Sequence, residues 1–88
     1  MNVVDRVDNL DPTPKFLQIA RIVREQIRSG DLEPERLIPS EIQMSQIYGV
    51  ARKTVRMGIR VLAEEGWVIT IQSRGTFVAP RDRWPEGE

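Results

Sequence analysis

Four positive side chains gather in one acid-free stretch of this 88-residue chain. Residues 42–63 contain four bases and no acid, whereas residues 1–41 hold eight acids and six bases and residues 64–88 hold five acids and three bases. The whole chain therefore has a formal net charge of zero, while its central stretch carries +4. Focused positive charge attracts polyanions such as nucleic acid, although a solvated helix face is the commoner origin of a short basic run.

The composition argues against an enzyme. The chain has no Cys and no His, which excludes disulfides and thiolate metal sites and removes the commonest general base and metal ligand. The acids are scattered through termini and turns, and we find no paired nucleophile and base, no metal cluster and no glycine-rich phosphate loop. We therefore expect no catalytic activity, no cofactor and no metal.

Length and hydropathy limit the organisation of the chain. A chain of 88 residues has room for one domain with one modest core. No apolar stretch approaches the roughly 20 residues that span a bilayer, and the N-terminal ten residues contain no hydrophobic signal region. We expect one soluble, cytoplasmic domain with no membrane partner and no small-molecule effector domain in this chain.

The four cations fall on one arc of a helix predicted over residues 52–65, which Gly66 ends. At about 100° per residue, an apolar side and a neighbouring basic side separate on this helix. The apolar side consists of Val55, Gly58, Ile59 and Leu62, and the basic side of Arg52, Lys53, Arg56 and Arg60. Such a helix buries one face and presents the other. Glu64 is placed to pair with Arg60, one turn away.

Two further helices are predicted before this one. Apolar residues at spacings of three and four begin after Lys15 and stop at Gly30, which indicates the first helix. Ser40 and Gln43 then form the S-x-x-Q pattern of a capping box, and Gly49 ends the second helix after barely two turns. The letters "RLIP" just before Ser40 indicate a short edge strand.

A hairpin is predicted after the basic helix. The stretch "WVITIQ" is rich in β-branched and aromatic residues, "SRG" is a turn signal with Arg74 at the tip, and "TFVA" resumes the strand. We expect the core to contain Phe16, Ile19, Val23, Ile27, Met44, Tyr48, Val55, Ile59, Leu62, Trp67 and Phe77. Residues 1–13 are expected to form a flexible arm, residues 14–79 the domain, and residues 80–88 a loosely ordered tail with Trp84 either docked or exposed.

This order, mainly α with a C-terminal hairpin, predicts an α+β fold of the winged helix-turn-helix type. Over residues 14–79 the chain also resembles the GntR family of bacterial transcriptional regulators. The matching motifs are the P-S-E element Pro39 to Glu41, the G-V-x-R-x-T-V-R motif Gly49 to Arg56, the E-G element Glu65 and Gly66, and the wing motif Arg74 to Val78. The chain departs from the family at Ala51 and Ile42, where Ser and Arg are usual, and at Glu35 and Ser73, where Gly is usual.

The winged-helix order assigns a contact to each basic element. The first turn of a helix in the major groove presents cations to guanine edges and phosphates, and a hairpin tip reaches the minor groove. A helix cap such as Ser40 directs backbone N–H groups toward a phosphate. The predicted DNA-binding residues are Ser40, Arg52, Lys53, Thr54, Arg56, Arg74 and Gly75.

The sequence thus predicts a sequence-specific transcriptional regulator, most simply a repressor, that binds double-stranded DNA. Because one helix and one wing cover only a half-site, we expect a homodimer on a palindromic operator in the cytoplasm, associated with the nucleoid. The alternative is a winged-helix module that binds an acidic protein or RNA without its own operator, which Ala51, Ile42 and the zero net charge favour slightly. The sequence leaves open whether the chain is a complete minimal regulator or a fragment of a longer protein.

Overall fold

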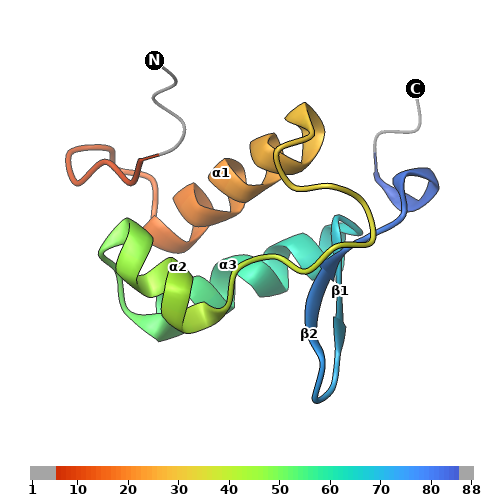
Figure 1. Ribbon diagram of the computed structural model, residues 1–88. Helices are drawn as coiled ribbons and strands as arrows, with labels where there is room; N and C mark the ends of the chain where they lie inside the picture. Colours follow the sequence, from red (N-terminus) through yellow and green to blue (C-terminus); the bar gives the residue numbers. More distant parts are fainter. Residues whose placement is uncertain (1–5, 86–88) are drawn as a thin grey trace.

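Three helices precede a two-stranded hairpin in the computed structural model, which describes residues 6–85 (Figure 1). In chain order the elements are α1 (Lys15–Ser29), α2 (Glu41–Tyr48), α3 (Arg52–Glu65), β1 (Val68–Ile71), β2 (Gly75–Val78) and the 3-10 turn η2 (Arg81–Arg83). This order confirms the predicted winged helix-turn-helix, in which β1 and β2 form the wing. No helix within residues 6–85 is long and apolar enough to cross a membrane.

Local sequence signals set the ends of the helices. α1 and α3 begin and end where their apolar spacing predicts, and Gly30 and Gly66 follow them in a left-handed conformation. At the start of α2, the Gln43 amide donates to Ser40 Oγ at 3.1 Å, and the Ser40 amide donates to Gln43 Oε1 at 2.8 Å. These two bonds form the predicted capping box and fix the residue at which α2 begins.

The core lies between α1 and α3 and extends to α2 and the wing. Gly58 lets the two long helices approach closely, because a Cβ atom there would lie 2.8 Å from the carbonyl oxygen of Phe16. The predicted core residues that are buried are Ile19, Val23, Ile27, Met44, Val55, Leu62 and Trp67. The others, Phe16, Tyr48, Ile59 and Phe77, are half-buried.

Phe77 lies outside the core because of the register of the wing. The two strands are antiparallel, with Val68 opposite Val78 and Ile69 opposite Phe77. Side chains alternate between the two faces of a strand, so Val68 and Val78 are buried against the helices. Ile69 and Phe77 share the outer face and are half-buried. Val78 therefore occupies the place in the core that was predicted for Phe77.

The predicted edge strand before α2 is a single bridge to the wing, between Leu37 and Phe77. The Ile38 amide also donates to the carbonyl oxygen of Thr76 at 2.9 Å. This contact ties the segment that leads into α2 to β2, and so sets the position of the wing relative to α2.

The chain before α1 folds back on that helix. Residues 6–13, part of the predicted flexible arm, form a loop around the buried Gln18. The Asp8 amide donates to Gln18 Oε1 at 2.8 Å, and Gln18 Nε2 donates to the carbonyl oxygen of Thr13 at 2.9 Å. The rest of the predicted arm, residues 1–5, lies outside the described residues.

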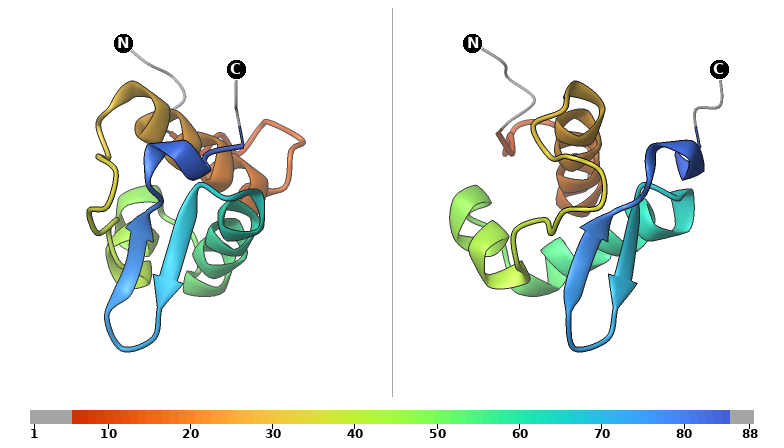
Figure 2. Two further views of the ribbon diagram at one scale, coloured as in Figure 1. Left: turned by 90° about the vertical axis from the view of Figure 1, so that its right-hand side faces the viewer. Right: turned by 45° about the vertical axis from the view of Figure 1, so that its right-hand side comes forward.

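The tail after β2 docks on the domain. Trp84 Nε1 donates to the carbonyl oxygen of Ala79 at 2.9 Å, and the rings of Trp84 and Trp67 lie 5.5 Å apart. The guanidinium of Arg81 lies 4.9 Å from the Trp84 ring centroid. Of the two alternatives for Trp84, the structure shows the docked one. Figure 2 places η2 at the end of the hairpin opposite its tip.

Candidate nucleic-acid interface

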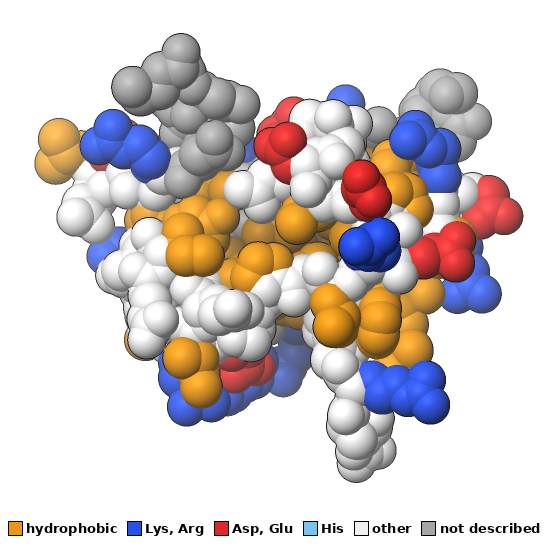
Figure 3. Space-filling model, in the orientation of Figure 1, with side chains coloured by type: hydrophobic (Ala, Val, Ile, Leu, Met, Phe, Trp, Pro, Cys, Tyr) orange, Lys and Arg blue, Asp and Glu red, His pale blue; other side chains and the backbone are white. Residues whose placement is uncertain are grey.

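The cations of α3 and the tip of the wing lie on one side of the molecule. Arg52, Lys53 and Arg56 are exposed on the first turns of α3, and Thr54 among them is half-buried. The hairpin extends beyond the helices on the same side (Figure 1). Figure 3 shows Lys and Arg side chains along this lower edge, beneath α2 and α3 and beside the hairpin. The fold therefore brings the predicted contacts of α3 and the wing to a common face.

Glu41, at the start of α2, pairs with two arginines of α3. Arg56 Nε donates to Glu41 Oε2 and Arg56 Nη2 donates to Oε1, both at 3.0 Å. Arg52 Nη2 lies 3.9 Å from Oε1 of the same carboxylate. The hydrogen bonds from Arg56 hold the pKa of the Glu41 carboxyl below its usual value and raise the pKa of the Arg56 guanidinium.

The pair between Glu41 and Arg56 orients the arginine more than it stabilises the fold. About half of the Arg56 side chain (52%) and a third of the Glu41 side chain (34%) are exposed, and ion pairs this exposed add little to stability. The bidentate geometry, however, fixes the plane of the guanidinium at the junction of α2 and α3. From the sequence, Glu41 is visible only as part of the P-S-E element, because Arg56 follows 15 positions later and no local spacing indicates the pair.

Ser40 caps α2, as its position predicts, and the proton of its hydroxyl remains available to a ligand. Its hydroxyl oxygen accepts from the Gln43 amide, and a hydroxyl that accepts one hydrogen bond still donates its own proton. The first N–H groups of a helix also attract anions. Ile42, exposed beside this helix start, offers no charge at the position where the family usually has Arg.

α3 begins without a side-chain cap. Ala51 is the N-cap residue, its backbone is extended, and no side chain accepts a hydrogen bond from the first turn. Its carbonyl oxygen accepts from the Thr54 amide at 3.0 Å. The predicted register of the first turn is therefore correct, and the N–H groups of Arg52 and Lys53, which have no hydrogen-bond partner among residues 6–85, are left to solvent or to a ligand.

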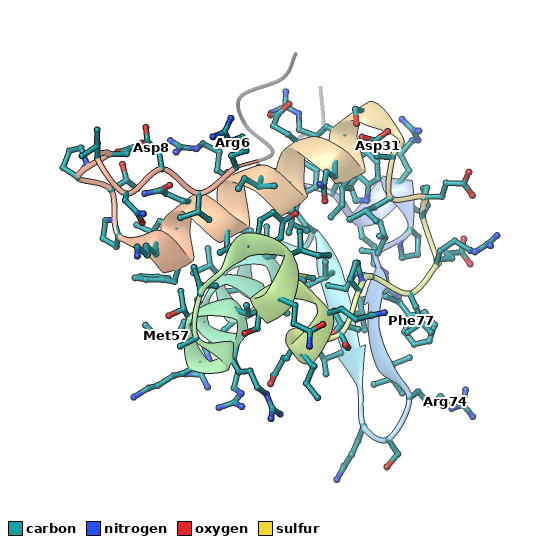
Figure 4. All side chains as sticks on the ribbon, turned by 60° about the vertical axis from the view of Figure 1, so that its left-hand side comes forward. Arg6, Asp8, Asp31, Met57, Arg74 and Phe77 are labelled. Carbon is teal, nitrogen blue, oxygen red and sulfur yellow. The ribbon has the colours of Figure 1, made fainter. Side chains whose placement is uncertain are left out.

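The side chain of Arg74 projects from the wing tip and pairs with no other side chain of residues 6–85. The Arg74 amide donates to the carbonyl oxygen of Ile71 at 3.0 Å and closes the turn. Its side chain extends on the side of the hairpin away from α2 (Figure 4) and makes no ion pair within residues 6–85. Gly75 has a φ of +119°, and a Cβ atom there would lie 2.9 Å from Leu37 Cδ2. The positive φ thus explains why a glycine stands at position 75, and its contact with DNA stays a prediction.

Arg60 does not form the ion pair that its spacing predicts. Within the described part of the chain, Arg60 has no ion pair with Glu64 or with any other acid. An i, i+4 pair on an exposed helix face is worth only a few tenths of a kcal/mol, so the two long side chains gain little by meeting. Arg60 instead lines a hollow between α3 and the wing, together with Arg56 and two threonines of the hairpin.

The fold and this face define a winged helix-turn-helix domain with a basic first turn on its third helix. A sequence profile described as bacterial regulatory proteins, gntR family, matches residues 15–78, and the chain belongs to this family. The HTH-type transcriptional repressor NagR of Bacillus subtilis is 34% identical over 73 residues, which are 83% of this chain and 30% of NagR. The HTH-type transcriptional regulator GgaR of Escherichia coli is 39% identical over 74 residues, which are 84% of this chain and 30% of GgaR.

Solved structures show the same architecture. YtrA from Sulfolobus acidocaldarius, a GntR-family transcription factor, superimposes with a TM-score of 0.81 at 29% identity, over 89% of this chain and 82% of that chain. AraR(DBD) in complex with operator ORE1 superimposes with a TM-score of 0.73 at 36% identity, over 75% of this chain and 80% of that chain. The chain spans about 30% of the length of NagR and GgaR.

Proposed function

We propose that the chain is the DNA-binding module of a transcriptional regulator, with α3 in the major groove and the wing at the minor groove or its backbone. One observation carries the proposal: exposed cations on the first turns of α3 are oriented by Glu41 and face the same side as the wing tip. A basic run that was merely solvated would need no such orientation. The solved complex of AraR(DBD), which has the same fold, with operator ORE1 supports this use of the fold.

The geometry of α3 suits the major groove. That groove is about 12 Å wide and admits one helix, whose first turn then reaches the base edges. The planar guanidinium of Arg56 matches the O6 and N7 acceptors of guanine. Arg52 and Lys53 on the same turn are placed for a base or a phosphate, and Thr54 for a phosphate or a thymine methyl group.

The proposal extends to repression, assembly and location. NagR is named as a repressor, and occlusion of a promoter is the simplest action of a DNA-binding module. One α3 and one wing cover a half-site, so two copies would bind a palindromic operator. The place of action would be the cytoplasm, on the nucleoid.

We propose no catalytic activity for this chain. The chain lacks His and Cys, and residues 6–85 contain no group of three or more acidic side chains arranged to hold a metal ion. The relatives are named as transcriptional regulators. Glu41, the acid of this interface, is also paired with Arg56 and so is not free to act as a general base.

A second candidate is an interaction module that binds an acidic protein or RNA. Two apolar side chains of α2 favour it, because Ile42 is 51% exposed and Ile47 is 63% exposed. Exposed apolar surface next to positive charge fits a protein partner. This candidate predicts binding to polyanions without a preferred DNA sequence.

Selection of bound duplexes from a random pool tests the proposal. The dissociation constants of the selected duplex and a scrambled duplex would then be measured at several salt concentrations. We expect a ratio of about a thousand or more between them, and two chains on each selected duplex. Equal binding to both duplexes would contradict the regulator and favour the second candidate.

A further inference from the structure

The hollow between α3 and the wing has the chemistry of an anion site. α3 packs against β1, and the two elements stand side by side in both views of Figure 2. The residues that line the space between them are Glu41, Arg56, Ile59, Arg60, Ala63, Thr70 and Thr76. Its polar groups are therefore two guanidiniums and one carboxylate from the helices, and two hydroxyls from the wing.

The charges in this hollow leave Arg60 as its unpaired cation. Both oxygens of the Glu41 carboxylate accept hydrogen bonds from Arg56, so that acid is neutralised within the site. Arg60 is exposed and has no ion-pair partner among residues 6–85. Two cations and one anion give the hollow a net charge of +1, and this charge resides on the Arg60 guanidinium.

The wing contributes a hydroxyl pair with a proton to spare. Thr70 and Thr76 lie directly opposite each other on β1 and β2, with their Oγ1 atoms 3.0 Å apart. Each hydroxyl carries one proton, and their mutual hydrogen bond uses only one of the two. The second proton is free to donate to a ligand in the hollow. On the same inner face, the next pair of side chains toward the core, Val68 and Val78, is apolar and buried, so the two threonines are the strand positions of this face that offer polar groups to the hollow.

We propose that this hollow binds one backbone phosphate of the DNA strand that passes between α3 and the wing, through Arg60, Thr70 and Thr76. The inference rests on the proposed function. A helix in the major groove and a hairpin at the adjacent minor groove flank the same sugar–phosphate strand, so a phosphate must cross the space between them. Ile59 and Ala63 provide apolar contact for the sugar, and the contact reads no base.

Replacement of Arg60 tests the site against a matched control. Arg60→Gln keeps the length and polarity of the side chain, and Arg83→Gln removes the same charge from the tail, at the end of the hairpin opposite its tip. We expect Arg60→Gln to lower the slope of log K against log salt by about 0.9 and to weaken selected and scrambled duplexes by the same factor. Arg83→Gln should leave unchanged both the salt slope and the affinity for each of the two duplexes.

Neutral methylphosphonate linkages locate the phosphate itself. They would be placed one at a time along the selected duplex, and binding would be measured for the wild type, Arg60→Gln and the double variant Thr70→Val, Thr76→Val. We expect one position at which the neutral linkage weakens the wild type about tenfold but leaves Arg60→Gln nearly unaffected. The threonine variant should show a smaller loss at the same position, and Thr70→Ser with Thr76→Ser should restore it. Valine and serine variants would be compared by thermal melting, so that a fold defect is distinguished from a lost contact.

The possible failures have different meanings. A wild type that prefers its selected duplex, but shows no phosphate whose effect depends on Arg60, overturns the assignment of the hollow and leaves the proposed function intact. A wild type with no preferred duplex overturns the proposed function and the phosphate site with it. Equal effects of Arg60→Gln and Arg83→Gln would also overturn the site, because general charge would then account for both.

Discussion

The first turns of α3 and the tip of the wing both present arginine, but they hold it differently. Arg56 is fixed by two hydrogen bonds to Glu41, whereas Arg74 has no partner within the described residues. A side chain that is ordered before binding loses less freedom when it binds. It also meets its ligand in one geometry, which the recognition of a base edge requires and the attraction to a phosphate does not. The difference suggests that α3 discriminates between sequences and the wing adds affinity.

The largest effect is expected from the oriented arginine. Arg56→Ala should weaken binding to the selected duplex about 10- to 100-fold, because a bidentate contact to guanine is lost. Binding to a scrambled duplex should change much less. Fluorescence anisotropy titrations on both duplexes would measure this. Equal losses on both would assign Arg56 to a phosphate and remove the contrast between the two regions.

Removal of the carboxylate that orients Arg56 tests whether this orientation contributes to sequence discrimination. Glu41→Gln leaves Arg56 in place but removes the carboxylate that orients it and the negative charge beside the DNA. We expect the scrambled duplex to bind more tightly and the ratio between the two duplexes to fall by about fivefold to tenfold. Glu33→Gln, which removes a charge from an exposed pair with Arg36, serves as the control. An unchanged ratio in Glu41→Gln would show that orientation of Arg56 contributes nothing to discrimination.

The wing should behave in the opposite way. Arg74→Ala should weaken both duplexes by a similar factor of a few-fold and lower the salt slope by about 0.9, because one phosphate contact is lost without a base contact. Titrations at four or more salt concentrations would give the slope. A selective loss on the selected duplex would instead make the wing the reader of sequence.

The smallest effect concerns the start of α3. Ala51→Ser supplies the missing cap and should raise the free energy of unfolding by about 1 kcal/mol. Its hydroxyl also lies beside the first turn, so DNA affinity should rise a few-fold. Urea denaturation and binding titrations would measure both. Ala63→Ser, an exposed substitution away from any helix start, is the control for stability alone and should not raise the free energy of unfolding.

The sequence predicted the features that depend on neighbouring residues, namely the helix ends and their caps. The ends of α1 and α3, the capping box of Ser40 and the position of Ala51 depend on residues within one or two turns, and the structure confirms them. The departures from family glycine at Glu35 and Ser73 also have local consequences. These are the two non-glycine residues with positive φ in the described chain, at +66° and +70°, and that conformation is costly for residues with a Cβ atom.

Contacts between segments that are distant in the chain could not be predicted from the sequence. The pairing of Glu41 with Arg56 depends on the angle between α2 and α3, which no local spacing encodes. Phe77 and Val78 are equally apolar, and only the register of β1 and β2 decides which is buried. The loop around Gln18 depends on a polar side chain that helical periodicity treats as a surface residue. In each case the missing information is tertiary.

A single-atom change in the DNA tests the central claim most directly. Replacement of each guanine of the selected duplex with 7-deazaguanine removes the N7 acceptor from the major groove and leaves the minor groove and base pairing intact. The account predicts one guanine in each half-site at which this replacement weakens the wild type about tenfold and has no further effect on Arg56→Ala. A loss of the same size in the wild type and in Arg56→Ala, or no sensitive guanine at all, would contradict the claim that Arg56 on α3 reads the major groove.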